Sequence, residues 1–170
     1  MSETERLKTL FRGRLETLEH LLTTAEEHFG DQSYFAFRIA PDMLPFGAQI
    51  AFTCDQPYNF ARWCEGLSSE LNDPAITSIV AARECVSKAK AWVANVSADD
   101  SILLTDKRID LGPELYVELP GRGYVEDFLL PNFYFHLATA YDILRMNGVP
   151  LGKGDYMKHL LPLVRQSAPV

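Results

Sequence analysis

One histidine, His136, could do chemistry, because it lies in a helix that is otherwise apolar on that side. It belongs to 131-PNFYFHLATAYDILRMNG-148, where apolar residues recur every three or four positions, as on one face of an α-helix. His136 falls beside that face and is expected to point at or near the core. A histidine there can be a metal ligand, a general base, or a core residue whose nitrogens are hydrogen-bonded.

A metal site on a helix usually needs a second ligand one turn away, because only residues three or four apart converge on one ion. The residue four positions after His136 is Ala140, and the one three positions after it is Thr139. Any remaining ligands would come from other segments, where the candidates are Asp42, Asp55, Gln49 and Cys54. The pattern therefore favours a hydrogen-bonded core histidine, with a ligand pocket or a metal or catalytic site as the alternatives.

Other patterns that could carry chemistry are weaker. The sequence contains no GxSxG, HExxH or P-loop motif, which are the common signatures of hydrolases, zinc proteases and nucleotide-binding proteins. Cys54, Cys64 and Cys85 are an odd number without CxxC spacing, which is typical of buried free thiols in a reducing compartment. Arg38 is expected to form a structural ion pair with Asp42 or another carboxylate.

The first segment that positions these residues is a helix from about Glu3 to Phe29. It has a continuous apolar stripe, a capping-box pattern at its start and Gly30 as its stop. Its histidines, His20 and His28, are expected at the surface, as is His159 near the end of the chain. Residues 30–47 then form a long connection, which leaves room for a crossover.

Two further helices are predicted in the middle of the chain. One runs from about Pro45 to Glu65 and is apolar on most faces, which is typical of a central helix or of half a subunit interface. Pro57 should kink it or end its first half. The next opens at 73-DP-74, an Asp N-cap followed by proline, and runs to about Val96.

The remaining segments are a hairpin, a long helix and a short one. Alternating residues in 106–119, around Gly112-Pro113, predict two short strands. The last long helix begins either near Arg122, with a bend at Pro131, or at Pro131 itself, and ends at Asn147-Gly148. Residues 155–166 could add a short helix capped by Asp155.

Composition and charge exclude several classes of protein. The 170 residues, 47% of them hydrophobic and 23% charged, fit a single domain, 1–170, that needs no disulfide or metal to fold. No apolar run is long enough to span a bilayer. The net charge of −7 argues against nucleic acid as a partner. The polar start, MSETERLKTL, does not suit a signal peptide, so a cytoplasmic protein is expected.

Two segments carry a family resemblance, 38-RIAPDMLPFGAQIAFTCD-55 and 131-PNFYFHLATAYDILRMNGVPLGKGDYM-157. They resemble an uncharacterised bacterial family of the DinB/YfiT-like superfamily, and the resemblance covers nearly the whole chain. It implies an all-α, up-down-down-up four-helix bundle, often dimeric, here with a small β-hairpin insert before the last long helix. Many superfamily members look like metal-dependent enzymes, with three histidines around a divalent ion, two of them in an HxxxH pair on the last main helix.

This sequence departs from that triad, since Ala140 stands where the second histidine of the pair would fall and the second helix contains no histidine. The family's motif positions that become candidates for a pocket are Arg38, Asp42, Asp55, Asn132 and His136.

We therefore expect a non-catalytic bundle that binds an unidentified small ligand near His136. It should hold no complete metal site and no cofactor, and form a homodimer through part of the second helix. The alternative is a metal-dependent enzyme of the thiol-dependent transferase, isomerase or hydrolase type. In that alternative, His136 with Asp42 or Asp55 would hold the ion.

Overall fold

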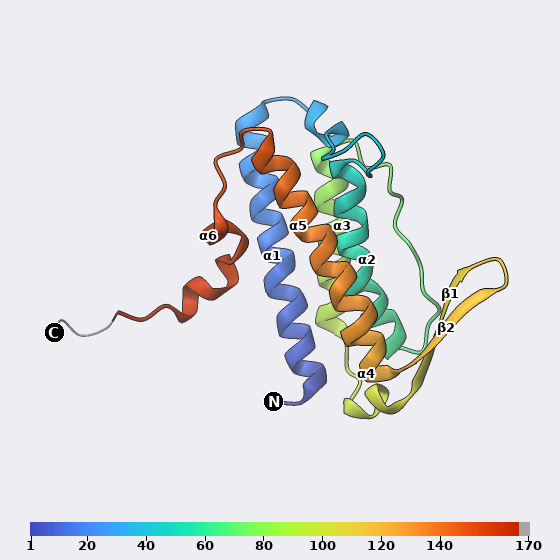
Figure 1. Ribbon diagram of the computed structural model, residues 1–170. Helices are drawn as coiled ribbons and strands as arrows, with labels where there is room; N and C mark the ends of the chain where they lie inside the picture. The colour runs from blue at the N-terminus through green and yellow to red at the C-terminus, as the bar shows by residue number, and fades with distance from the viewer. Residues whose placement is uncertain (167–170) are drawn as a thin grey trace.

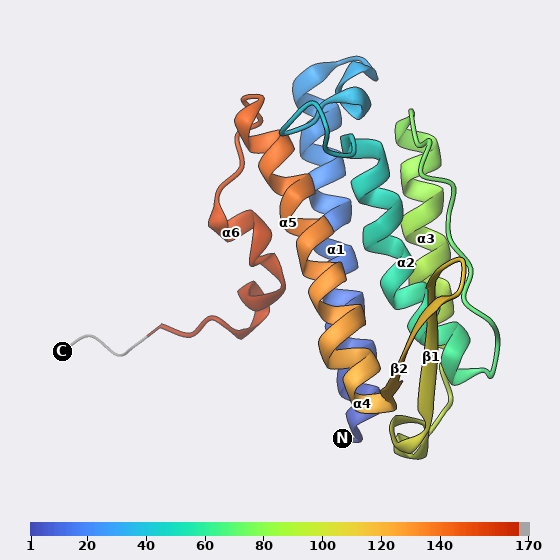
Figure 2. The same ribbon diagram turned by 45° about the vertical axis from the view of Figure 1, so that its right-hand side comes forward.

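Four long helices lie side by side in the computed structural model, which describes residues 1–166 (Figures 1 and 2). They are α1 (Glu3–Phe29), α2 (Phe46–Cys64), α3 (Ile79–Asn95) and α5 (Leu130–Met146). α2 and α3 both run opposite to α1, and α5 runs parallel to α1 (Figure 1). The up-down-down-up bundle implied by the resemblance is therefore confirmed.

The first helix has the predicted boundaries because both of its ends are encoded locally. The Ser2 hydroxyl accepts a hydrogen bond from the Glu5 backbone N–H at 3.2 Å, and Gly30 ends the helix in the left-handed conformation with φ 71°. The buried face of α1 meets the other helices through Phe11, whose ring centroid lies 5.4 Å from that of Phe60 and 5.3 Å from that of Phe133. These rings join α1, α2 and α5 in one core.

The crossover connection lies between α2 and α3 and not after α1. Residues 66–78, which we call the strap, run back along the length of the bundle (Figure 2). Residues 30–45 instead join neighbouring ends of α1 and α2 and include the 3-10 helix Ser33–Ala36. The expectation of a crossover at residues 30–47 was therefore wrong. α2 and α3 run in the same direction, so the chain needs its long return connection between these two helices.

The predicted start of the third helix at Asp73-Pro74 is also wrong. The Asp73 carboxylate accepts a hydrogen bond from the Ala75 backbone N–H at 2.9 Å, which is a local turn. The helix begins at Ile79, and its N-cap is Ser78, whose hydroxyl accepts from the Ala81 N–H at 3.2 Å. The sequence thus contains two possible N-caps, Asp73 and Ser78, and the helix begins after the second.

The second helix is central in the bundle. Nearly all of α2 is buried, including Pro57, and the helix continues through that proline. α3, α5 and the strap pack around it (Figure 2). Burial of α2 inside a single chain thus explains why the helix is apolar on most faces. These faces therefore no longer support a dimer interface on α2. The homodimer stays a prediction, which light scattering at micromolar concentration would test.

The hairpin is formed as predicted, by β1 (Asp106–Gly112) and β2 (Leu115–Pro120) in antiparallel pairing, with Ile109 opposite Val117. Its turn uses positive φ angles at Gly112 (130°) and Glu114 (62°). In Figure 2 the hairpin lies against the end of the bundle where α2 finishes and α5 begins. It therefore covers polar residues in the last turns of α2.

The last long helix starts at the earlier of the two predicted positions. It opens with α4 (Gly121–Gly123), continues as a π-helix (Tyr124–Leu129) and becomes α5 without a break. Pro131 lies in the first turn of α5. Gly148, with φ 89°, follows its end as expected.

The chain then returns along α1 as a C-terminal segment, residues 153–163, made of α6 (Lys153–Tyr156) and a 3-10 helix (Lys158–Leu163). Asp155 is not the N-cap predicted, because it lies inside α6 and accepts a hydrogen bond from the Gly152 N–H at 2.8 Å. Its other oxygen contacts His20 Nε2 at 2.8 Å, so His20 binds this segment and is not freely solvated. Within residues 1–166, no helix has the length and apolarity that crossing a membrane requires.

Candidate functional site

His136 is held by a glutamine of the facing helix. Its Nδ1 lies 2.7 Å from Oε1 of Gln49, and the Gln49 amide nitrogen donates to the Leu44 carbonyl at 3.0 Å. Oε1 is therefore the acceptor, and Nδ1 carries the proton. Burial lowers the pKa of His136, which favours the neutral ring. His136 is thus a half-buried, hydrogen-bonded histidine at the edge of the core, and its ring centroid lies 5.2 Å from that of Phe52.

The other pocket candidates make separate local contacts. Arg38 and Asp42 are both exposed, and Arg38 donates to the Met43 carbonyl at 3.1 Å. The predicted carboxylate partner of Arg38 is wrong for the described residues, because backbone carbonyls of its own connection take that place. Asn132 donates to the Phe128 carbonyl at 2.7 Å. Within residues 1–166, no hydrogen bond or ion pair joins any two of the five candidates.

The donor groups do not fit the three-histidine ion of the superfamily. Among the described residues, no three His, Cys, Asp or Glu side chains gather closely enough to hold an ion. Ala140, at the position of the missing histidine, is fully buried in the core. The two thiols Cys54 and Cys85 are buried and free, and Cys64 is half-buried and free.

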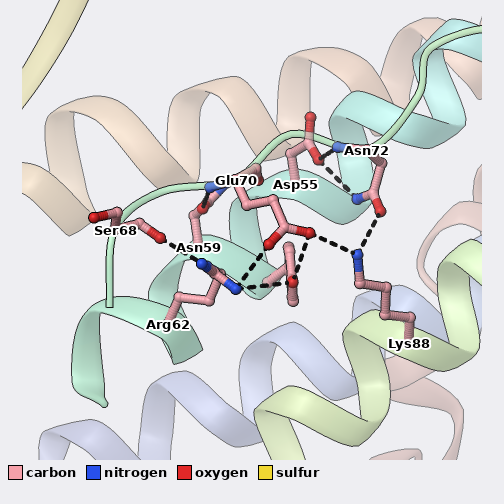
Figure 3. A network of polar contacts seen from close by, with 8 residues as sticks. Asp55, Asn59, Arg62, Ser68, Glu70, Asn72 and Lys88 are labelled. Carbon is pink, nitrogen blue, oxygen red and sulfur yellow. Dashed lines mark hydrogen bonds and ion pairs between the residues drawn. The ribbon is translucent and has the colours of Figure 1, made fainter. Parts of the chain in front are cut away.

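Asp55 belongs to a polar network that attaches the strap to α2 (Figure 3). Its Oδ1 accepts hydrogen bonds from the backbone N–H of Asn72 at 2.8 Å and from the Asn72 side chain at 2.7 Å. One turn along α2, Asn59 pairs with the backbone of Glu70 in both directions, at 2.8 and 2.9 Å. Two buried side chains of α2 thus hold the strap backbone at two points.

The outer part of this network is charged. The Glu70 carboxylate lies 2.9 Å from Arg62 and 3.2 Å from Lys88 and accepts from the Tyr58 hydroxyl at 3.1 Å (Figure 3). Arg62 also donates to the Ser68 carbonyl at 2.7 Å. The network links α2, α3 and the strap, so it fixes the shape of the wall that the strap presents to the hairpin.

A cavity of about 600 Å³, which we call the hairpin pocket, lies between α2, the strap, β1 and the π-helix. Its volume is within the usual range for small-molecule sites. A π-helix in one wall is also notable, because such segments are rare and frequently occur at functional sites. The lining residues with amide, hydroxymethyl or charged side chains are Gln56, Asn59, Ser68, Ser69, Lys107, Arg108 and Asp110.

Lys107 is the unusual group in this pocket. It is half-buried, and its ammonium group lies 5.7 Å from the centre of the Tyr124 ring. No carboxylate of residues 1–166 lies within 4 Å of it, whereas the neighbouring Arg108 pairs with Asp110 at 2.9 Å. Desolvation lowers the pKa of Lys107. An anion in the pocket would relieve this cost.

Aromatic and amide groups complete the pocket. Tyr124 and Phe128, from successive turns of the π-helix, stack with centroids 6.0 Å apart. Burial raises the pKa of Tyr124 to about 12, so its hydroxyl stays protonated. The Gln56 amide nitrogen donates to the Phe52 carbonyl at 3.0 Å, which leaves its oxygen as an acceptor. Together with Lys107, these groups can bind an organic anion.

The hairpin pocket was not predicted from the sequence. Its residues come from four separate segments, and nothing local distinguishes Lys107 from other lysines. One signal was available, namely three polar residues close together, Asp55, Gln56 and Asn59, inside a mostly apolar helix. Buried polar side chains need partners, so they indicated that other segments cover this end of α2.

Comparison with known proteins agrees with the fold and leaves the ligand open. Residues 7–157 match the family described as "Domain of unknown function (DUF1993)". The crystal structure of a DinB family member protein from Shewanella denitrificans is similar, with 27% sequence identity and a TM-score of 0.77, over 98% of this chain and 97% of that chain. No curated protein matches.

Proposed function

This chain belongs to the DUF1993 family, and we propose that it is a binding protein for a small organic anion, which occupies the hairpin pocket. The ligand has an aromatic or apolar body and one acidic group. This proposal moves the expected ligand site from His136, which is bonded to Gln49 in the first turns of α2, to the hairpin pocket at the other end of that helix.

The observation that carries the proposal is the half-buried Lys107, which has no carboxylate within 4 Å in the part of the chain that the structure describes. A cation in such a place is costly unless a negative charge accompanies it. The acidic group of the ligand would pair with Lys107, and its body would lie against Tyr124 and Phe128, where aromatic rings favour stacked or edge-to-face contacts.

Naphthoate, an aromatic carboxylate, is a suitable probe, followed by calorimetry and by the fluorescence of Trp63, whose ring lies 5.1 Å from that of Tyr124. We expect Lys107→Gln to weaken naphthoate binding about tenfold, since one charge-assisted hydrogen bond contributes about 1.5 kcal/mol. The matched control is Lys153→Gln, which changes an exposed lysine of α6 and should bind as the wild type does.

The neutral analogue naphthalenemethanol separates charge from hydrophobic binding. The wild type should bind it more weakly than it binds naphthoate. The wild type and Lys107→Gln should bind it with equal affinity, because it carries no charge for Lys107 to pair with. No binding of naphthoate at millimolar concentration, or equal affinity of the wild type and Lys107→Gln, would contradict the proposal.

We also propose that the protein works without a resident divalent metal. The support is that no three His, Cys, Asp or Glu side chains of residues 1–166 gather closely enough to hold an ion, and that Ala140 stands where a second histidine would fall. Elemental analysis of protein purified without chelators should find far less than one zinc, nickel or iron per chain, with the same result for His136→Ala. Stoichiometric metal that disappears in His136→Ala would instead support the metal-dependent enzyme.

A further inference from the structure

Arg14 of α1 is a partly buried arginine without a hydrogen-bond or ion-pair partner among residues 1–166. Its Nε is buried and has no hydrogen-bond acceptor among residues 1–166, and no carboxylate of that range lies within 4 Å of its guanidinium. Arginine cannot lose its charge to relieve this cost. Buried N–H groups in proteins nearly always have an acceptor, so this one calls for an explanation.

A second buried atom without a partner lies in the same place. Nδ1 of His159, in the C-terminal segment, is buried and has no hydrogen-bond partner among the described residues. His159 and Arg14 line one cavity of about 360 Å³, together with Tyr134 and Tyr156. The cavity lies between α1, α5 and the C-terminal segment, so docking of that segment completes it.

The C-terminal segment lies close against α1 at this point. A side chain at Gly13 would come within 3.5 Å of the His159 Cβ. The acidic residue of the segment, Asp155, is already bonded to His20 and to the Gly152 N–H. It is therefore engaged elsewhere and does not neutralise Arg14.

From these two unpaired groups we infer that the cavity, which we call the Arg14 cavity, binds a small oxyanion, a carboxylate or a phosphate. The guanidinium of Arg14 supplies several N–H donors in a planar fork, which suits both anions. Neutral His159 can carry its proton on Nδ1 and donate a further hydrogen bond. The hydroxyls of Tyr134 and Tyr156 are additional donors in the same cavity.

The Arg14 cavity is separate from the hairpin pocket. The hairpin and α6 lie on opposite sides of the bundle (Figure 2), and the two linings share no residue. The inference therefore does not depend on the proposed function, and each can fail alone.

The test uses the full chain titrated with inorganic phosphate and, separately, with acetate, followed by calorimetry and by backbone amide NMR shifts. The wild type should bind at least one of them saturably, with shifts in residues around Arg14 and His159. If phosphate binds more tightly, the natural ligand carries a phosphate, and if acetate does, it carries a carboxylate. Absence of saturable binding of both at millimolar concentration would overturn the inference.

Variants locate the site. Arg14→Gln should weaken binding at least tenfold. Arg14→Lys keeps the positive charge but lacks the planar guanidinium, so it should weaken binding less than Arg14→Gln does. It also keeps the test valid if Arg14→Gln does not fold. The control Arg145→Gln, at an exposed arginine of α5, should bind as the wild type does. Unchanged affinity in Arg14→Gln would overturn the inference.

Discussion

Gly47→Ala is expected to lower the free energy of unfolding by about 3 kcal/mol or more, which for a chain of this size is roughly 6–12 °C in melting temperature. Gly47 lies in the first turn of α2, where the strap crosses it. An added Cβ would lie 1.9 Å from the backbone oxygen of Ile76. A flexible side chain could turn aside, but a backbone carbonyl moves only if the strap moves.

Urea denaturation followed by circular dichroism would measure this loss. Gly154→Ala is the matched control, because Gly154 is exposed and a Cβ there would meet nothing within 4 Å. The control should stay within about 0.5 kcal/mol of the wild type. A Gly47→Ala protein as stable as this control would mean that the strap does not pack on α2 as described.

The strap also shows why the sequence predicted some helices better than others. The ends of α1 depend on Ser2 and Gly30, which are next to the helix in sequence. The start of α3 depends in part on Gln32, whose side-chain oxygen accepts a hydrogen bond from the Ile79 N–H at 2.7 Å. That partner lies 47 residues away in the chain. Local cap signals at Asp73 therefore could not decide where the helix begins.

The candidate site was predicted only in part for the same reason. Helical periodicity placed His136 beside the core, and its neighbour Gln49 had been named only as an alternative ligand. Periodicity could not show that these two side chains bond to each other. Nor could it show that Lys107 faces the last turns of α2, because a hairpin's docking position depends on tertiary contacts and not on its own sequence.

Asp55→Asn is expected to raise the free energy of unfolding at pH 7 by roughly 2–3 kcal/mol. Asp55 is fully buried, and its Oδ2 has no hydrogen-bond partner among the described residues. Burial raises the pKa of this carboxyl from 3.8 to about 6. An asparagine keeps the oxygen that accepts from Asn72 and removes the buried charge.

The direction of the pH dependence follows from the raised pKa. The folded protein holds this proton more tightly than the unfolded chain does, so Asp55 favours folding most below pH 3.8 and loses that contribution as the pH rises to about 6. The stability of Asp55→Asn relative to the wild type should therefore grow between about pH 4 and pH 6. The other titrating groups contribute equally to the free energy of unfolding of both proteins, so their contributions cancel when the two proteins are compared at each pH.

Asp55→Ala separates the cost of the charge from the value of its hydrogen bonds. It leaves the backbone N–H and the side-chain amide of Asn72 without their acceptor, and each buried unpaired donor costs about 1–3 kcal/mol. We expect this variant to be less stable than Asp55→Asn at every pH, and Asp127→Asn, at an exposed position, to follow the wild type. A constant difference between Asp55→Asn and the wild type from pH 4 to pH 7 would show that Asp55 is not desolvated, and that the strap admits water to the carboxylate.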